Sequence, residues 1–277
     1  MEKTLSVLSF NVYGTPFVPH KLLKTLMRNN IRKRFRLIAK EINLLSPDVV
    51  LLQEVHDYFH LHYMMKFLSE YPHSFYRHSY FGPRGGLVII SKHQLGQKHY
   101  IDFHTRGKYF DKSITGHLSG KGVLLARIKS TDVYLLNTHL TQNSLHNWDV
   151  ESNYVRILKS QLIQLGQLVN TFTTRKKSLI LAGDFNMPKN SVYYHEFLQE
   201  TKLLDSFKND SFTTYHQSFL PKGASVGRLD FIFSTSSLKT TKTAYFLKKP
   251  VIIDEKEWYL SDHIGLYCIF KFEKLLQ

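Results

Sequence analysis

The sequence predicts an α/β fold built as a four-layer α/β-sandwich, with two mainly antiparallel β-sheets packed face to face and helices on their outer sides. Three features predict it. Short runs of Val, Ile, Leu and Phe recur along the chain, a few amphipathic helical patterns lie between them, and no repeat or linker-like tract divides the 277 residues. We therefore expect a single domain over residues 1–277 with a substantial buried core.

Eight short apolar runs are predicted to be strands that are buried on at least one face. In chain order they cover 5–11, 49–53, 87–91, 123–128, 133–138, 178–182, 228–234 and 264–271. The last run contains the only cysteine, Cys268. We expect a buried thiol there, and one cysteine excludes a disulfide framework.

Three helices are predicted between these strands. Residues 31–45 repeat apolar side chains at 4-3-4-3 spacing and stop before Pro47, the same spacing continues over about 151–172, and a shorter helix covers 191–200. The first helix also carries the densest basic cluster of the chain, which we interpret as a solvated face. Its members are Arg28, Arg32, Lys33, Arg34 and Arg36.

The charge of the chain points to a phosphate-rich partner. The net charge is +15, from 37 Lys and Arg against 22 Asp and Glu, and such a field attracts nucleic acid or an acidic membrane surface. No apolar run is long enough to cross a bilayer, and the N-terminus lacks a secretory signal pattern. We expect a cytoplasmic monomer with peripheral membrane contact at most; a mature secreted form would have the same sequence.

Polar residues stand at the carboxyl ends of successive apolar runs. Asn11, Glu54 and His139 each follow such a run, and Asp184 and Asn186 follow residues 178–182. Strand ends are where sites are usually built. Each residue also has a structural explanation, as an exposed strand end, a buried histidine or a turn, but their recurrence favours a site.

Asp230 is a carboxylate within the apolar run 228–234. A buried charge needs a partner, and Asp262-His263, which precedes the last strand, offers an imidazole that an aspartate can orient. A purely structural Asp–His pair is the alternative interpretation.

The residue types suit metal-assisted phosphate-ester hydrolysis. Glu54, Asn11 and Asp262 are hard oxygen ligands of the kind that bind Mg²⁺, with Mn²⁺ as a substitute and one or two ions, and zinc-like Cys and His spacing is absent. His263, held by Asp230, is the candidate base, or Asp184 positions the water or takes its proton. Donors to the phosphate are expected from two residues, His139 and Asn186.

The ordered motifs resemble those of the endonuclease/exonuclease/phosphatase superfamily. They are Phe10-Asn11-Val12, Leu52-Gln53-Glu54-Val55, Asn137-Thr138-His139-Leu140, Gly183-Asp184-Phe185-Asn186, Arg228-Leu229-Asp230-Phe231-Ile232 and Ser261-Asp262-His263. The resemblance implies the four-layer sandwich and Mg²⁺-dependent phosphodiester or phosphomonoester cleavage. It also implies that Glu54 is the principal metal ligand, with Asn11 and Asp262 near the metals and the other motif residues around the phosphate.

Within the superfamily, the chain is most similar to the neutral sphingomyelinases. Residues 116–124 resemble a Lys-bearing stretch of those enzymes, and Lys121, between Gly120 and Gly122, would contact a lipid phosphate as a point charge with little steric cover. A plain turn before the next strand is the alternative. Asp205 also stands where those enzymes often have a Leu-Asp-Ala-like step.

The leading hypothesis is therefore a sphingomyelinase-like phospholipid phosphodiesterase. The same centre and the positive charge also fit a nuclease acting on DNA or RNA, although Phe10 and Ile264 depart from the pattern of abasic-site endonucleases. A binding module that has lost its chemistry is the third reading. Aromatic residues crowd 57–81; they either pack or contact a lipid interface or bases.

Overall fold

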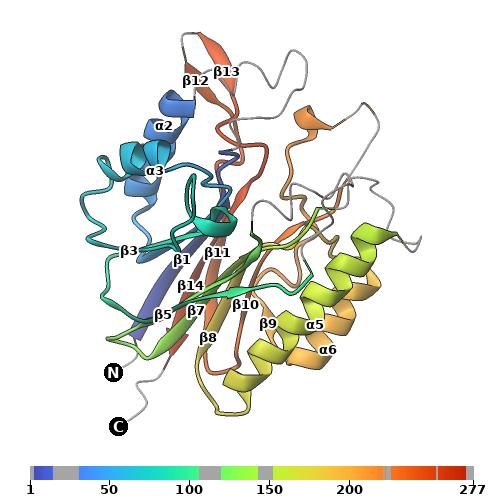
Figure 1. Ribbon diagram of the computed structural model, residues 1–277. Coiled ribbons are helices and arrows are strands. Elements are labelled where there is room, and N and C mark those ends of the chain that lie inside the picture. Colours follow the sequence, from blue (N-terminus) through green and yellow to red (C-terminus); the bar gives the residue numbers. More distant parts are fainter. Residues whose placement is uncertain are drawn as a thin grey trace.

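The computed structural model describes residues 3–14, 31–105, 120–142, 152–220, 222, 226–253 and 255–272. Two six-stranded sheets pack face to face, and helices cover the outer side of each (Figure 1). The predicted four-layer α/β-sandwich is confirmed. A separate hairpin, β12 (Val251–Ile253) and β13 (Lys256–Trp258), projects beyond the sheets.

The first sheet has the strand order β11-β14-β1-β2-β4-β3. Its strands are β11 (Lys239–Phe246), β14 (Gly265–Phe272), β1 (Lys3–Asn11), β2 (Val49–Gln53), β4 (Val88–Ser91) and β3 (His73–Phe75). The central pair, β1 and β2, is parallel, and the other neighbours are antiparallel.

The second sheet repeats this plan in the order β5-β6-β7-β8-β10-β9. Its strands are β5 (Leu95–Asp102), β6 (Gly122–Ile128), β7 (Val133–His139), β8 (Leu179–Asp184), β10 (Asp230–Ser234) and β9 (Leu204–Asp205). Here too the central pair, β7 and β8, is parallel among antiparallel neighbours. Each sheet therefore has two adjacent strands whose carboxyl ends meet at one edge.

Helices α2 (Ile31–Leu45) and α3 (Tyr58–Met65) pack on the first sheet, and α5 (Asn153–Thr173) and α6 (Val192–Thr201) pack on the second. The structure confirms the three predicted helices and adds α3, together with two short 3₁₀ turns, η1 (Arg84–Gly86) and η2 (Gln217–Phe219). Asp57 caps α3 and Ser152 caps α5, each through a side-chain oxygen that accepts a backbone N–H.

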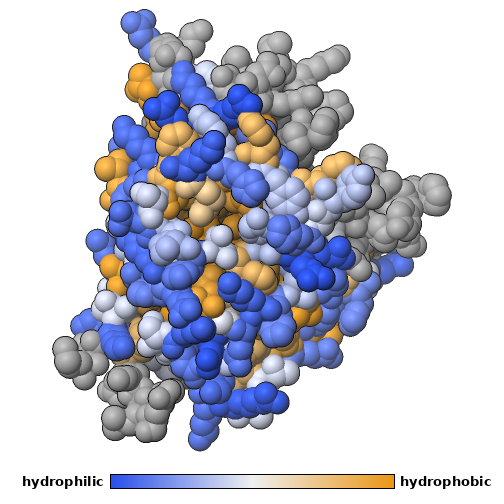
Figure 2. All heavy atoms as spheres, turned by 60° about the vertical axis from the view of Figure 1, so that its left-hand side comes forward, coloured by the Kyte–Doolittle hydropathy of each residue, from blue (hydrophilic) through white to orange (hydrophobic). Residues whose placement is uncertain are grey.

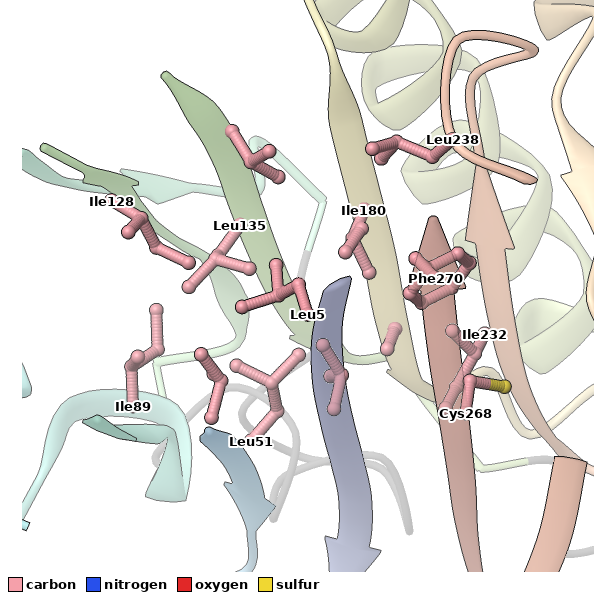
Figure 3. Close-up of a cluster of buried hydrophobic side chains, with 14 of the residues drawn as sticks. Leu5, Leu51, Ile89, Ile128, Leu135, Ile180, Ile232, Leu238, Cys268 and Phe270 are labelled. Carbon is pink, nitrogen blue, oxygen red and sulfur yellow. The ribbon is translucent and has the colours of Figure 1, made fainter. Parts of the chain in front are cut away.

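The main core lies between the two sheets (Figure 3). Leu5, Leu51 and Ile89 of the first sheet face Leu135 and Ile180 of the second. Alternate residues of the same strands point outward and bury against the helices. This packing fixes the two sheets relative to each other, and with them the strand ends that carry polar residues.

The basic face predicted for α2 is only partly correct. Arg32, Lys33 and Arg36 are exposed, but Arg34 is buried, while Arg28 lies outside the described residues. On the face shown in Figure 2, hydrophilic side chains cover most of the surface and apolar side chains form separate groups between them. Among the helices described, none is long and apolar enough to span a membrane.

Candidate active site

Four of the predicted site residues meet at the ends of the two central parallel strand pairs. Asn11 ends β1 and Glu54 follows β2, whereas His139 and Asp184 end β7 and β8 as direct register partners. Parallel neighbours deliver their carboxyl ends to the same edge of a sheet. Because the sheets are packed face to face, these side chains from distant parts of the sequence converge.

The carboxylate of Asp184 is the centre of this cluster. Its Oδ2 accepts a hydrogen bond of 3.1 Å from Asn11 Nδ2 and lies 3.5 Å from Nε2 of both His139 and His263. Its Oδ1 accepts the backbone N–H of Asn186 at 2.9 Å. Asp184 therefore contacts residues from three other motifs as well as Asn186 of its own.

The partner predicted for Asp230 is present. His263 Nδ1 lies 2.8 Å from Asp230 Oδ2, and both side chains are buried. This contact fixes the ring so that Nε2 faces Asp184. Asp230 is the first residue of β10 rather than an interior one, and it is the register partner of Asp184.

Backbone strain marks the loops that carry the site. Glu54 has φ of 60°, a left-handed conformation that a long acidic side chain rarely adopts, and Asn186 has φ of 51°. Gly183 has φ of 147°, and a Cβ there would lie 1.9 Å from the carbonyl oxygen of Thr138. Only glycine therefore allows β7 and β8 to approach this closely just before Asp184.

Lys121 reaches the same place from the start of β6. Its Nζ donates to the carbonyl oxygen of Leu140 at 2.7 Å, and Asn186 Nδ2 donates to that oxygen at 3.1 Å. The side chain is buried, so the prediction of an ammonium with little steric cover is wrong. A Cβ on Gly122 would lie 2.3 Å from the oxygen of Ile101, so that glycine serves packing.

Burial dominates the electrostatics of the site. It raises the pKa of Asp184 to about 7 and the pKa of Asp262 to about 6, the latter with a contribution from the charge of Glu54. Burial opposes a charged imidazole at His263, but the charges of Asp230 and Asp184 outweigh it and raise its pKa well above the usual value. Buried carboxylates are thus gathered where added positive charge would stabilise them.

A divalent cation fits this donor set. Within the described chain, ligand atoms of Glu54, His139 and Asp184 lie within 4.8 Å of one another, as do those of Asp184, Asp230 and His263. Carboxylate oxygens are suitable ligands for a hard cation, and partly exposed Glu54 leaves access from solvent.

The predicted ligand Asp262 lies outside these two groups of acidic and imidazole side chains, whereas the predicted ligand Asn11 adjoins them through hydrogen bonds to Glu54 and Asp184. Asn11 Nδ2 donates to Glu54 Oε1 at 3.0 Å, while its Oδ1 accepts the Tyr13 N–H at 3.0 Å. Asp262 Oδ2 accepts a hydrogen bond of 3.1 Å from the Tyr215 hydroxyl. In this arrangement Asn11 orients the Glu54 carboxylate.

Arg34 supports the site from behind, and this role was not predicted from the sequence. The guanidinium of Arg34 donates to the carbonyl oxygens of Val12, Tyr13 and Leu260, and so ties the loop after β1 to the loop that carries Asp262. Its place within a basic run concealed this role.

A second missed contact joins the sheets below the site. Gln53 Nε2 donates to Asn137 Oδ1 at 2.8 Å, and Asn137 Nδ2 donates to the carbonyl oxygens of Leu52 and Val88. Both amides stand inside apolar runs, which is the signal that identified Asp230 and could have identified them.

Comparisons with known proteins agree with this geometry. A sequence model described as the Endonuclease/Exonuclease/phosphatase family matches residues 8–263. A Drosophila melanogaster protein named "Putative neutral sphingomyelinase" is 29% identical over 285 residues, which cover 98% of this chain and 61% of that protein. The chain therefore spans less than two thirds of the length of that relative.

Solved structures share the fold at low sequence identity. A family protein from Bacteroides thetaiotaomicron aligns with a TM-score of 0.71 at 15% identity, covering 99% of this chain and 96% of that one. TDP2 from D. rerio, complexed with a single strand DNA product, aligns with a TM-score of 0.68 at 20% identity, covering 96% and 98%.

Proposed function

Because the chain belongs to the Endonuclease/Exonuclease/phosphatase family, we propose that it is a phosphodiesterase and that its substrate is a phospholipid. The reaction would be a phospholipase C-type cleavage of a sphingomyelin-like lipid that releases the phosphorylated headgroup. Similarity along almost the whole chain to a protein named as a neutral sphingomyelinase supports this substrate class.

The observation that carries the proposal is the buried ammonium of Lys121. Its pKa is lowered to about 8 by burial, while the charges of Asp184 and Glu54 act to raise it, so the ammonium lies within electrostatic reach of both carboxylates. A compact point charge placed there is suited to a non-bridging oxygen of a headgroup phosphate.

We propose that the cofactor is Mg²⁺, with Mn²⁺ as a substitute. Glu54 and Asp184 would hold it, with Asn11 and Asp262 beside them. A bound Mg²⁺ would neutralise charge on the phosphate and on the leaving oxygen. The residues themselves would position the substrate and move the proton.

The Asp184–His263 pair would orient the attacking water and take its proton, since the two groups lie 3.5 Å apart and both face the cluster. Asp230 would hold the imidazole in place through Nδ1. His139 and the amide of Asn186 would donate to the phosphate oxygens.

Phosphocholine release from sphingomyelin vesicles tests this function. We expect release with Mg²⁺, none with EDTA, and a loss of at least about 10²-fold in the Glu54→Gln and His263→Ala variants. Leu204→Ala, at an exposed position of the edge strand β9, is the matched control and should retain activity. No metal-dependent release by the unaltered protein would refute the proposal.

A nuclease is the second candidate, because the net charge is +15 and a structure of the same fold binds a single strand DNA product. This function predicts cleavage of single-stranded or plasmid DNA that weakens steeply as the salt concentration rises. Intact DNA at low salt with Mg²⁺ or Mn²⁺ would remove it.

A further inference from the structure

Two neighbouring aromatic side chains are almost completely exposed. Tyr80 and Phe81 have exposed fractions of 90% and 78%, and their rings contact each other edge to face at 4.8 Å between centroids. Large aromatic side chains normally contribute their area to a core. Here they contribute almost none.

These residues form the tip of a tight hairpin. The backbone N–H of Ser79 donates to the Gly82 oxygen at 3.1 Å, its hydroxyl donates to the same oxygen at 2.9 Å, and Arg84 N–H donates to the Arg77 oxygen at 2.7 Å. Turn tips usually carry Gly, Asn, Asp or Pro for conformational reasons. Tyr80 and Phe81 serve no such purpose, so we conclude that the turn presents them to the surroundings.

The hairpin is held firmly against α3. The hydroxyl of Tyr58 donates to the Ser79 oxygen at 2.8 Å and accepts the Ser79 N–H at 3.0 Å. The Tyr58 ring also lies 5.5 Å from that of His78. The tip therefore has a defined position relative to the body of the protein.

The same hairpin is joined to the active site. A Cβ on Gly82 would lie 2.3 Å from the oxygen of His56, so the two backbones are in direct contact there. Val55 N–H donates to the Gly86 oxygen at 2.9 Å. Both contacts involve the loop that immediately follows Glu54, so the hairpin is anchored to the backbone beside the proposed metal ligand.

The segment around the tip is positively charged. Residues 71–101 contain no Asp or Glu but include Arg77, Lys92 and Lys98, together with Arg84, whose guanidinium pairs with Asp102 at 2.7 Å. Arg77 and His78, next to the tip, are exposed. Aromatic side chains flanked by cationic ones are typical of segments that settle in the headgroup region of a bilayer.

We propose that Tyr80 and Phe81 insert into the interface of a phospholipid bilayer and hold the active site at its surface. This inference deepens the proposed function, on which it rests for the identity of the substrate. It explains how a protein whose described helices cannot span a membrane would act on a lipid that remains in the bilayer. Nucleic acid is less suitable, because bases stack on ring faces that line a groove, whereas these rings stand at the end of a turn.

Vesicle binding in EDTA tests insertion without catalysis. Vesicles of phosphatidylcholine and phosphatidylserine at a ratio of about 7:3 are floated with the unaltered protein and with Tyr80→Ser/Phe81→Ser. We expect the double substitution to weaken partitioning at least about tenfold. Ile163→Ser/Val192→Ser, which removes exposed apolar side chains from α5 and α6, is the matched control and should leave partitioning unchanged.

A Phe81→Trp variant tests insertion of the tip directly, through the fluorescence of the introduced tryptophan. Vesicles with brominated acyl chains should quench its fluorescence more than that of the unaltered protein, which has Trp148 and Trp258. Equal quenching, or equal partitioning of the serine variant and the unaltered protein, overturns the inference. Weakened binding to a labelled single-stranded oligonucleotide with unchanged vesicle binding also overturns it and assigns the tip to nucleic acid.

Activity measurements separate this inference from the proposed function. The tip substitutions should lower cleavage of sphingomyelin in vesicles at least about tenfold more than cleavage of a monomeric short-chain sphingomyelin. If the tip substitutions change the cleavage of neither substrate, the inference is overturned and the proposed function stands. If the tip substitutions weaken vesicle binding but the protein cleaves neither substrate, the proposed function is refuted and the membrane contact stands.

Discussion

At the residue scale, Lys121 has a position that packing alone does not explain. Its ammonium is buried beside the Asp184 cluster, where removing a charge from water is costly, and it donates a hydrogen bond to the carbonyl oxygen of Leu140. A charge retained in such a place has a function in binding or catalysis more often than in stability.

Replacing Lys121 with Met should therefore affect catalysis more than folding. The thioether chain fills the space of the lysine stem, so we expect the melting temperature to change little, while kcat/KM for sphingomyelin falls about 10²-fold because one charged contact to the phosphate is lost. Lys242→Met, at an exposed position of β11, controls for the loss of a cation. Unchanged kcat/KM in the Lys121 variant would show that the ammonium is structural.

Arg228 and Asp205 form a second buried ionic contact, and this one is structural. Both side chains are fully buried, and two guanidinium nitrogens donate to the two carboxylate oxygens, Nη1 at 3.0 Å from Oδ1. The Tyr194 hydroxyl also donates to Asp205 at 2.7 Å. The Asp205 step that resembles neutral sphingomyelinases therefore supports β9 and β10 and lies outside the cluster around Asp184.

Breaking this pair should destabilise the protein strongly. Arg228→Met leaves the Asp205 charge buried without its partner, so we expect the free energy of unfolding to fall by about 3–5 kcal/mol. The double variant Arg228→Met/Asp205→Asn should recover part of the loss, because the unpaired charge is gone. Urea unfolding followed by circular dichroism measures both, and equal stability of the single and double variants would contradict the explanation.

Most of the site was predictable from single residues because each stands at the end of an apolar run. Arg34 was not, since a basic residue within a basic run gives no sign of burial. Its burial follows from where Val12, Tyr13 and Leu260 place their carbonyl oxygens, which depends on the folded chain.

At the element scale, the place of a strand within its sheet separates the predicted strands from the missed ones. All eight predicted strands are interior members of the two sheets, whereas β3, β5, β9 and β11 are the sheet edges. An edge strand buries less of its surface in the core than an interior strand does. The sequences of β5 and β11 are therefore largely polar and contain no apolar run. The projecting hairpin β12–β13 was missed as well.

Helix α3 was missed because its signal lies in its cap rather than its periodicity. Asp57 accepts the His60 N–H at 2.8 Å and contacts His60 Nδ1 at 2.6 Å. Burial raises the pKa of Asp57, but the hydrogen bonds from His60 outweigh this and lower it below the usual value. The cap therefore stabilises the folded state most when it is ionised.

Asp57→Ala should lower the free energy of unfolding by about 1 kcal/mol at pH 7, and Asp57→Asn, which keeps a capping oxygen, by less. A carboxyl with a depressed folded pKa stabilises above its unfolded pKa of about 4 and loses this contribution as the pH falls through the folded value. The difference between the unaltered protein and Asp57→Asn should thus shrink from pH 7 to pH 3. A stability difference that stays constant between pH 7 and pH 3 would show that the cap acts through its geometry and not through its charge.

At the scale of the whole molecule, the two sheets are built alike and deliver the site together. Each has a parallel pair at its centre, and the ends of these pairs carry Asn11, Glu54, His139 and Asp184. The site therefore exists only while the sheets remain packed on each other. A probe in the core between them reports on the integrity of the site.

Cys268 is such a probe. It lies on β14 in the core between the sheets, where it is fully buried (Figure 3), and burial raises the pKa of its thiol to about 12. At pH 8 only about one thiol in 10⁴ would be ionised in the folded state, compared with a large fraction in an unfolded chain. Folding thus protects the Cys268 thiol from reagents in two ways, because it blocks access to the thiol and suppresses its ionisation.

We expect the native protein to react with a chromogenic disulfide reagent at pH 8 at the rate at which it unfolds, and the urea-unfolded protein to react at once with one thiol per chain. The labelling rate should rise with urea in parallel with the loss of hydrolytic activity, because opening the sheets exposes the thiol and disperses the site. Cys268→Ala gives the blank. Rapid labelling of the fully active protein would contradict the strand register, which places Cys268 opposite Val7 in this core.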